Sequence, residues 1–307
     1  MNNLILGGAG FIGQHLAHGL LKTRQERVTI IDNLKTSSIN LEDFSQYKNL
    51  FEFINEDLTT IDDEEFMEIG RRNHRIFHLA ASVGVKNVVE NPKKTLFNNM
   101  QMSCKLLPLF EKLKKPVLYT STSEVYGEGP FDEDAECKIG TSKNLRWSYA
   151  SSKLTTEFMF NSCNFPSTIV RLFNVVGPGQ SGEIGMVLPR FIESAKRNED
   201  IIIHGEGKQI RSFCHVKDAV GAMIKLIEFN GEIFNIGNES PITIEELANK
   251  VKKILNSNSK IVYEPLEKVY QKNYGDISKR VPNLEKIKKT INYKPNYDLD
   301  EIIKEMI

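Results

Sequence analysis

The stretch Leu4-Ile5-Leu6-Gly7-Gly8-Ala9-Gly10-Phe11-Ile12-Gly13 decides the fold of this chain. A short apolar run meets glycines at positions 7, 10 and 13, and apolar residues at helical spacing follow. This order predicts a buried strand that turns sharply into a helix. Because glycine lacks a side chain, a pyrophosphate can approach the backbone there and accept hydrogen bonds from the helix N-terminus. Asp32 ends the next apolar run, nineteen residues after Gly13, where an acidic side chain would bind the hydroxyls of an adenosine ribose.

The composition argues against several classes of protein. The 307 residues include 40 basic and 40 acidic side chains, so no net field attracts nucleic acid or a membrane surface. No apolar stretch is long enough to span a bilayer, and the first strand begins too early to leave room for a signal peptide. The four cysteines form no CxxC pair, which predicts free thiols in a reducing cytoplasm. The six histidines show no metal-ligand spacing, so we expect no metal site.

Short apolar runs alternate with helical patterns over residues 1 to about 170. The runs lie at 3–6, 27–31, 51–54, 75–79, 116–120 and 168–171, and the helical patterns at 11–22, 63–71, 94–113 and 148–162. This alternation predicts an α/β fold, a Rossmann doubly wound parallel sheet with helices on both faces. Ligands bind such sheets at the carboxyl ends of the strands.

A glycine- and proline-rich stretch after Asn174 interrupts this rhythm and suits a loop that covers a substrate. Beyond it we expect a helix near 187–197, a strand near 201–204, a helix and strand within 216–236, and helices at 243–255, 283–290 and 298–306. We therefore expect a dinucleotide-binding domain of residues 1–173 and 216–236. A smaller, interleaved substrate domain would take residues 174–215 and 237–307.

Tyr149 and Lys153 lie four residues apart on a predicted helix, so they share one face. A lysine ammonium beside a tyrosine favours the phenolate, and the same lysine can donate to a nicotinamide ribose. The pair would form a general base that removes a hydroxyl proton as hydride leaves the carbon. Thr122 can hydrogen-bond the same hydroxyl.

Eight motifs follow one another along nearly the whole chain. They are Gly7–Gly13, Asp32–Leu34, Asp57-Leu58, His78–Ala81, Thr122–Gly127, Tyr149–Lys153, Arg171–Pro178 and Gly205–Phe213. This series resembles the extended short-chain dehydrogenase/reductase family, and within it the NAD-dependent nucleotide-sugar epimerases, dehydratases and decarboxylases. Leu6 departs from the threonine usual in that family, but we expect little consequence because the backbone binds the phosphates there.

The resemblance implies a tightly bound NAD that oxidises sugar C4 and later returns the hydride to a 4-keto intermediate. It implies a cofactor site made of Gly7, Gly10, Phe11, Ile12, Gly13, Asp32, Asn33, Asp57, Leu58, Leu79, Ala80, Ala81, Asn99, Tyr149 and Lys153. Asp32 would bind the ribose and Asp57 the adenine. It implies a nucleotide-sugar site, with a UDP-sugar expected, made of Val85, Ser123, Asn174, Val187, Leu188, Arg211 and Arg280. Asn174 and Arg211 would bind the diphosphate.

Glu124 discriminates between the reactions of this family, because simple 4-epimerases tend to carry a small residue there. The expected catalytic set is therefore Thr122, Glu124, Tyr149, Lys153 and Arg280. The segments 146–149 and 279–282 resemble UDP-glucuronate decarboxylases, in which the arginine matching Arg280 lies near the sugar carboxylate. The segment 82–86 is more similar to sugar 4-epimerases.

The leading prediction is accordingly a UDP-glucuronate decarboxylase. A UDP-hexose or UDP-uronate 4-epimerase and a 4,6-dehydratase remain alternatives. A protein that only senses or scaffolds through bound NAD is a further alternative, but such proteins commonly lose the tyrosine or the lysine that this chain keeps.

The family usually forms homodimers through two helices per subunit, here expected at about 94–113 and 148–162. An apolar stripe on these helices would supply either the dimer face or the core. Its members are Leu106, Leu107, Leu109, Phe110, Leu113, Phe158 and Met159.

Overall fold

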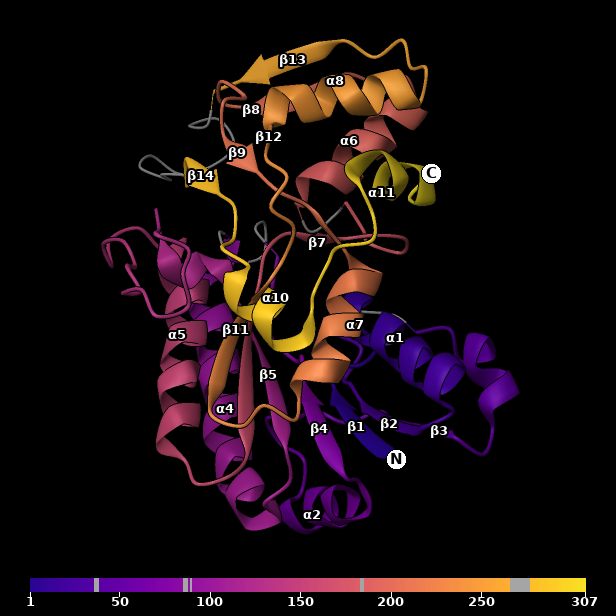
Figure 1. Cartoon of the computed structure of the whole chain (residues 1–307), viewed down its shortest axis with the longest axis vertical. Helices are drawn as coiled ribbons and strands as arrows, with labels where there is room; N and C mark the ends of the chain where they lie inside the picture. Colours follow the sequence, from indigo (N-terminus) through magenta and orange to yellow (C-terminus); the bar gives the residue numbers. More distant parts are fainter. Residues whose placement is uncertain (36–38, 85–87, 89, 183–184, 266–276) are drawn as a thin grey trace.

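A seven-stranded parallel sheet forms the centre of the computed structural model, which describes residues 1–35, 39–84, 88, 90–182, 185–265 and 277–307 (Figure 1). Its strands are β1 (Asn2–Leu6), β2 (Arg27–Ile31), β3 (Phe51–Ile54), β4 (Arg75–His78), β5 (Val117–Thr122), β6 (Ser167–Leu172) and β11 (Glu232–Ile236). Their order is β11-β6-β5-β4-β1-β2-β3, so the chain changes direction between β1 and β4. A ligand crevice is expected at the carboxyl ends of these two strands. The predicted doubly wound α/β fold is confirmed.

Helices cover both faces of the sheet because alternate strand residues point to opposite sides. In β1, Ile5 faces one hydrophobic core, while Leu4 and Leu6 face another. The first core is covered by α1 (Phe11–His18), its continuation η1 (Gly19–Thr23), α7 (Val216–Leu226) and α10 (Glu285–Ile291). The second is covered by α2 (Asp63–Arg72), α4 (Pro92–Leu113) and α5 (Trp147–Ser162).

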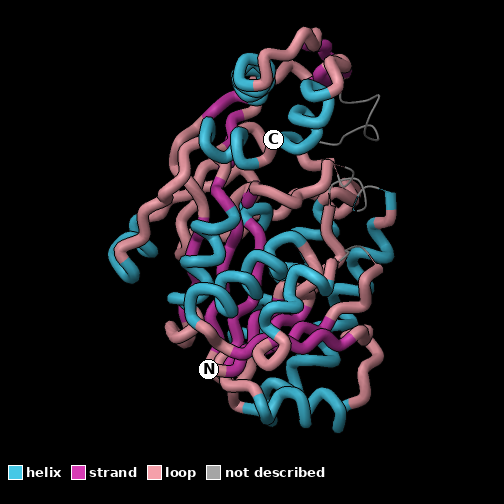
Figure 2. Tube along the Cα trace, turned by 90° about the vertical axis from the view of Figure 1, so that its right-hand side faces the viewer, coloured by secondary structure: helices cyan, strands magenta, loops and turns pink. Residues whose placement is uncertain are grey.

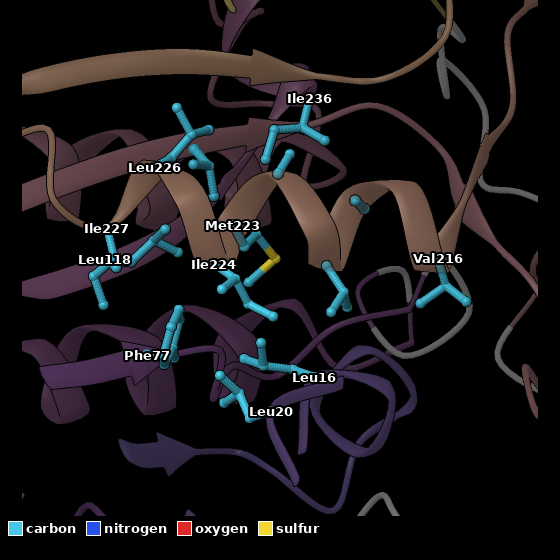
Figure 3. Packing of buried hydrophobic residues seen from close by; sticks show 14 of the residues in the cluster. Leu16, Leu20, Phe77, Leu118, Val216, Met223, Ile224, Leu226, Ile227 and Ile236 are labelled. Atoms are coloured by element: carbon cyan, nitrogen blue, oxygen red, sulfur yellow. The ribbon is translucent and has the colours of Figure 1, made fainter. Parts of the chain in front are cut away.

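The first core shows how the two halves of the chain pack together. Leu16 of α1 and Leu20 of η1 belong to the same cluster as Met223 and Ile224 of α7, with Phe77 of β4 beside them (Figure 3). Residues more than 200 positions apart therefore share one buried interior. Burial of each such side chain contributes about 1.5–3 kcal/mol.

A second group of elements lies beyond the carboxyl ends of the strands (Figure 1). It contains α6 (Val187–Lys196), β8 (Ile201–His204), α8 (Ile244–Ile254), β13 (Ile261–Glu264) and α11 (Leu299–Glu305), which surround a third core. The two termini lie apart, with the N-terminus at the foot of the sheet and the C-terminus in this upper group (Figure 2). The ligand crevice expected at the carboxyl ends of β1 and β4 would therefore lie between the sheet and these elements.

Three short pairings connect the two groups. Here β7 (Val175–Val176) pairs with β10 (Cys214–His215), and β9 (Ile210–Arg211) lies between β12 (Ile242–Thr243) and β14 (Lys279–Arg280). The sequence analysis missed these strands, because two residues are too few to show a periodic pattern. It also missed the 3-10 helix η2 (Leu41–Tyr47). Every helix that it predicted is present, with ends that differ by a few residues.

The apolar stripe on α4 and α5 is mostly interior. Its members Leu106, Leu107, Leu109, Phe110 and Leu113 are buried in the second core, which is one of the two alternatives predicted for the stripe. They pack against the sheet and α2. Phe158 on α5 is 67% exposed, and Phe97 on α4, which the analysis did not single out, is 62% exposed.

In the parts of the chain that the structure describes, no helix combines the length and the apolar character needed to cross a bilayer.

Candidate active site

The glycine-rich corner between β1 and α1 has the shape needed to hold a pyrophosphate. Gly7 has φ +78°, and a Cβ on it would come within 2.5 Å of the backbone of Ala80. A Cβ on Gly13 would approach the Cα of Gly8 to 2.6 Å, so this close packing requires glycine. A Cβ on Gly10 would meet nothing nearer than the Gly7 carbonyl oxygen at 3.4 Å. The N-terminus of α1, which begins at Phe11-Ile12, therefore faces open space that an anion can occupy.

Asp32 lies at the end of β2, directly beside this corner. Its Oδ2 accepts a hydrogen bond from the Ala9 N–H at 3.0 Å, and its Oδ1 accepts one from the Leu34 N–H at 2.9 Å. The side chain is almost fully buried. The carboxylate is therefore held at one orientation, next to the glycines, as the ribose-binding prediction requires.

Asp57 lies at the next position along this edge. It accepts hydrogen bonds from Asn33 Nδ2 at 3.2 Å and from the Thr59 hydroxyl at 2.7 Å, and it forms an ion pair with Lys35 at 2.6 Å. Burial by itself raises the pKa of Asp57, but the bonds from Lys35 and Thr59 outweigh it and hold that pKa well below its usual range. The neighbouring Leu58 is buried in the second core.

The segment Leu79–Ala81 leaves β4 toward the same crevice, and Asn99 of α4 fixes its end. Asn99 Oδ1 accepts a hydrogen bond from the Ser82 N–H at 2.7 Å, and its Nδ2 donates to the Ser152 hydroxyl at 3.0 Å. Ser152 precedes Lys153 in α5. Asn99 therefore links the loop after β4 to the helix that carries the expected base.

Tyr149 and Lys153 share one face of α5, and the lysine also contacts groups other than Tyr149. Lys153 Nζ donates to the carbonyl oxygen of Thr120 at 2.7 Å and lies 4.6 Å from the centre of the Tyr119 ring and 6.0 Å from that of Tyr149. Burial lowers the pKa of Lys153 to about 7, although the Glu157 carboxylate acts in the opposite direction. The lysine is therefore only partly charged near neutral pH.

The pKa of Tyr149 is raised, first by burial and then by the Glu124 carboxylate, while Arg280 acts in the opposite direction. Burial is the largest of these causes, because it disfavours the charged phenolate. The role of Lys153 in favouring the phenolate stays a prediction.

The residues after β5 form a short 3-10 helix, η3 (Ser123–Tyr126), at the rim of the crevice. Thr122 caps it, since its Oγ1 accepts a hydrogen bond from the Glu124 N–H at 3.2 Å. Ser123 is buried. Glu124 is contacted by two arginines, Arg280 Nη1 at 3.2 Å from Oε1 and Arg146 Nη2 at 3.8 Å from Oε2. The structure thus brings together Glu124 and Arg280, which lie 156 positions apart.

Asn174 joins the same cluster. Its Oδ1 accepts a hydrogen bond from Arg280 Nη2, and its Nδ2 donates to the Ser212 carbonyl oxygen at 2.8 Å. Arg211 lies opposite Arg280 in the β9–β14 pairing, and its Nη1 donates to the Ile210 carbonyl oxygen at 2.9 Å. The structure thus brings Asn174 into contact with Arg280 and places Arg211 opposite Arg280 in the β9–β14 pairing, while diphosphate binding by Asn174 and Arg211 stays a prediction.

Two predicted substrate residues begin α6. The side chain of Leu188 is fully buried in the third core, so only its backbone is available to a ligand. Val187 is partly buried against the same core. Val85 lies outside the described residues. Arg146 was missed as a site residue, although its position three residues before Tyr149 at the start of a helix was the available signal.

No group of three or more metal-binding side chains occurs in the described part of the chain. The residues in the crevice instead fit a dinucleotide. The glycine corner leaves room for a pyrophosphate, and Asp32, held by the Ala9 N–H, lies beside it where it could bind the ribose.

Known proteins share this arrangement over the whole chain. Residues 3–237 match the family described as the NAD dependent epimerase/dehydratase family. A UDP-N-acetyl-alpha-D-glucosaminuronate decarboxylase of Bacillus cytotoxicus is 38% identical over 99% of this chain and 96% of its own length. The UDP-glucuronic acid decarboxylase 3 of Arabidopsis thaliana is 34% identical over 98% of this chain and 86% of its own length.

Among solved structures, the UDP-glucose 4-epimerase of Thermotoga maritima with UDP-glucose has a TM-score of 0.84. It is 28% identical over 100% of this chain and 97% of its own length. The predicted NAD cofactor and the predicted enzyme class are confirmed by these matches. The chain belongs to the NAD dependent epimerase/dehydratase family of extended short-chain dehydrogenases/reductases.

Proposed function

We propose that this enzyme decarboxylates a UDP-linked hexuronate, either UDP-glucuronate or its 2-acetamido counterpart. The observation that carries the proposal is the contact of Arg280 with Glu124 at 3.2 Å, at the end of β5 and beside Tyr149. A guanidinium at this place can bind the C6 carboxylate of a hexuronate, which a neutral hexose lacks. Both decarboxylases among the similar proteins act on substrates of this class.

The protein side chains would perform the first step as a group. Thr122 would hydrogen-bond the C4 hydroxyl, and the Tyr149 phenolate would remove its proton. The glycine corner and Asp32 would hold NAD, which when bound supplies a hydride acceptor for C4. Lys153 would bind the nicotinamide ribose. The result is a ketone at C4.

Decarboxylation then needs little further chemistry, because a 4-ketone makes the C6 carboxylate a β-keto acid. The C5–C6 bond breaks and carbon dioxide leaves. The electron pair of the broken bond stays on the sugar and forms an enolate across C4 and C5. The enolate takes up a proton at C5, and reduction of C4 completes a UDP-pentose. Arg280 and Glu124 lie where they can bind the carboxylate and exchange a proton near C5.

A 4-epimerase is the second candidate. It is favoured by the likeness to the Thermotoga maritima enzyme and by the segment 82–86, part of which lies outside the described residues. An epimerase needs no acid or base beyond Tyr149, so the two arginines around Glu124 would have no evident task in it. That difference favours the decarboxylase.

The deciding experiment is incubation of the purified enzyme with UDP-glucuronate, UDP-N-acetylglucosaminuronate, UDP-glucose and UDP-N-acetylglucosamine. We expect carbon dioxide release and a UDP-pentose, identified by NMR and mass, from at least one hexuronate and from neither hexose. The Tyr149→Phe variant is the control. Interconversion of epimers without loss of mass would contradict the proposal and establish the epimerase.

The remaining expectations belong to the same proposal. We place the dinucleotide in residues 1–173 with 216–236 and the sugar nucleotide against 174–215 with 237–307. Cys104, Cys137, Cys163 and Cys214 are free thiols, which supports a cytoplasmic location. Phe97 and Phe158 expose large rings on α4 and α5, which supports a homodimer through these helices.

A further inference from the structure

Two arginines contact different oxygens of Glu124, and they are held in different ways. Arg280 donates to Oε1 and also to the side chain of Asn174, from the two-residue strand β14. Its Nε is buried and has no hydrogen-bond partner among the described residues. Arg146 contacts Oε2 at 3.8 Å, and only 5% of its side chain is exposed.

Arg146 is fixed by packing. Its guanidinium lies 4.6 Å from the centre of the Trp147 ring, a cation–π contact. The Trp147 ring in turn fills the space in front of Gly140, where an added Cβ would come within 2.1 Å of the indole nitrogen. Arg146 also occupies the N-cap position of α5, one turn before Tyr149. The position of the Arg146 side chain is therefore determined by α5, the helix that also carries Tyr149.

These differences suggest different tasks. The Nε donor of Arg280 is unused, and its other nitrogens contact Glu124 and Asn174, which a ligand can replace. The guanidinium of Arg280 can therefore move its hydrogen bonds to a substrate carboxylate. That transfer would remove one counter-charge from Glu124 while bringing a second negative charge close to it. Two carboxylates within a few ångströms destabilise each other's ionised forms. A second, fixed cation is needed to hold the Glu124 side chain against this repulsion.

We propose that Arg146 is a positioning residue that keeps the Glu124 side chain in place and oriented while Arg280 is transferred to the carboxylate of the hexuronate. This inference rests on the proposed decarboxylase function. It assigns Arg280 to substrate binding and Arg146 to the second chemical step. Arg146 acts through Glu124 and does not touch the sugar.

The test is a double-mutant cycle between positions 124 and 146, measured on the hexuronate that releases carbon dioxide. Arg146→Met keeps the length of the side chain and removes its charge. We expect it to lower kcat for carbon dioxide release by about 10- to 100-fold and to change KM by less than about threefold. Bound NADH, followed by its absorbance, should accumulate because C4 oxidation continues.

In a Glu124→Gln background the same Arg146→Met change should lower kcat by less than about twofold, because the partner through which it acts is gone. Arg146→Lys should recover most of the activity, since it restores a cation. Lys143→Met, which removes an exposed cation three residues before Arg146, is the control and should stay close to the parent enzyme. Thermal unfolding of each variant shows that the fold is retained.

Two results would overturn the inference. One is an Arg146→Met effect of equal size with and without the Glu124 carboxylate. The other is a rise in KM for the hexuronate that matches that of an Arg280 variant, which would make Arg146 a substrate-binding residue. A parent enzyme that releases no carbon dioxide from any hexuronate would instead overturn the proposed function itself, so the two failures are distinguishable.

Discussion

Lys35 Nζ lies 2.6 Å from Asp57 Oδ2 and forms an ion pair with it. Lys35 is the cation closest in sequence to Asp32, so that cation is already paired with another carboxylate. A ribose 2′-phosphate placed at Asp32 would meet a carboxylate, with its nearest lysine already paired. NAD presents a free diol there, which a carboxylate binds by accepting hydrogen bonds.

We therefore expect the enzyme to bind NAD in preference to NADP, and Asp32→Ala to reduce that preference by about tenfold or more. Calorimetric titration of cofactor-free protein with both dinucleotides measures it. Asp57→Asn should weaken the binding of both dinucleotides, but it should change the ratio of their affinities less than Asp32→Ala does. Tighter binding of NADP by the parent protein would contradict the assignment of Asp32.

Lys153 makes the ligand-free protein more stable as pH rises. Burial lowers its pKa to about 7, below the 10.5 of the unfolded chain, so between these values the unfolded state binds more protons. Its contribution to the free energy of unfolding therefore increases with pH through this window, by up to about 1.4 kcal/mol per pH unit.

The measurement is denaturant unfolding of the parent and of Lys153→Met between pH 7 and 8.5, below the range in which the buried Cys214 thiol begins to oppose the trend. The parent should gain stability relative to the variant as pH rises. Parallel curves for the two proteins would show that Lys153 stays charged in the fold.

The sequence was sufficient for the sheet and the cofactor corner, because both depend on local patterns. Apolar runs of four to six residues and glycines at fixed spacing are visible in a few adjacent positions, and β1 and α1 lie where these predict. The contact of Glu124 with Arg280 could be expected only from the resemblance, since 156 residues separate them and β14 is two residues long. The segment 146–149 was singled out, but no role could be predicted for Arg146, because that role depends on which carboxylate the fold places beside it.

The pKa of Tyr149 illustrates the same limit. Spacing alone placed Lys153 on its face of α5, but it could not show that the ammonium donates to the Thr120 carbonyl and is itself desolvated. Burial is a property of the whole fold. Here burial raises the pKa of Tyr149, whereas a nearby lysine ammonium considered alone would lower it.

Tyr149→Phe should leave binding of the nucleotide sugar nearly unchanged and lower kcat by at least about 100-fold. The phenol oxygen acts on a proton that moves in the transition state, whereas the ring still fills its place in α5. Substrate affinity by calorimetry and turnover by NMR separate the two effects. Near-full activity of the variant would mean that another group is the base.

Arg280→Ala separates the decarboxylase from the epimerase by substrate charge. If Arg280 binds the C6 carboxylate, its loss removes a charge-assisted hydrogen bond and should raise KM for the hexuronate by about 10- to 100-fold. A neutral UDP-hexose makes no such contact, so its binding as a competitive inhibitor should change by less than about threefold. Glu124 loses one of its two arginines in this variant but keeps Arg146, so C4 oxidation, followed as bound NADH at saturating hexuronate, should continue. Arg280→Lys is the matched control, and it should restore part of the affinity because a lysine keeps the charge but not the forked geometry. Equal losses for the charged and the neutral sugar would place Arg280 on the diphosphate and return the epimerase to first place.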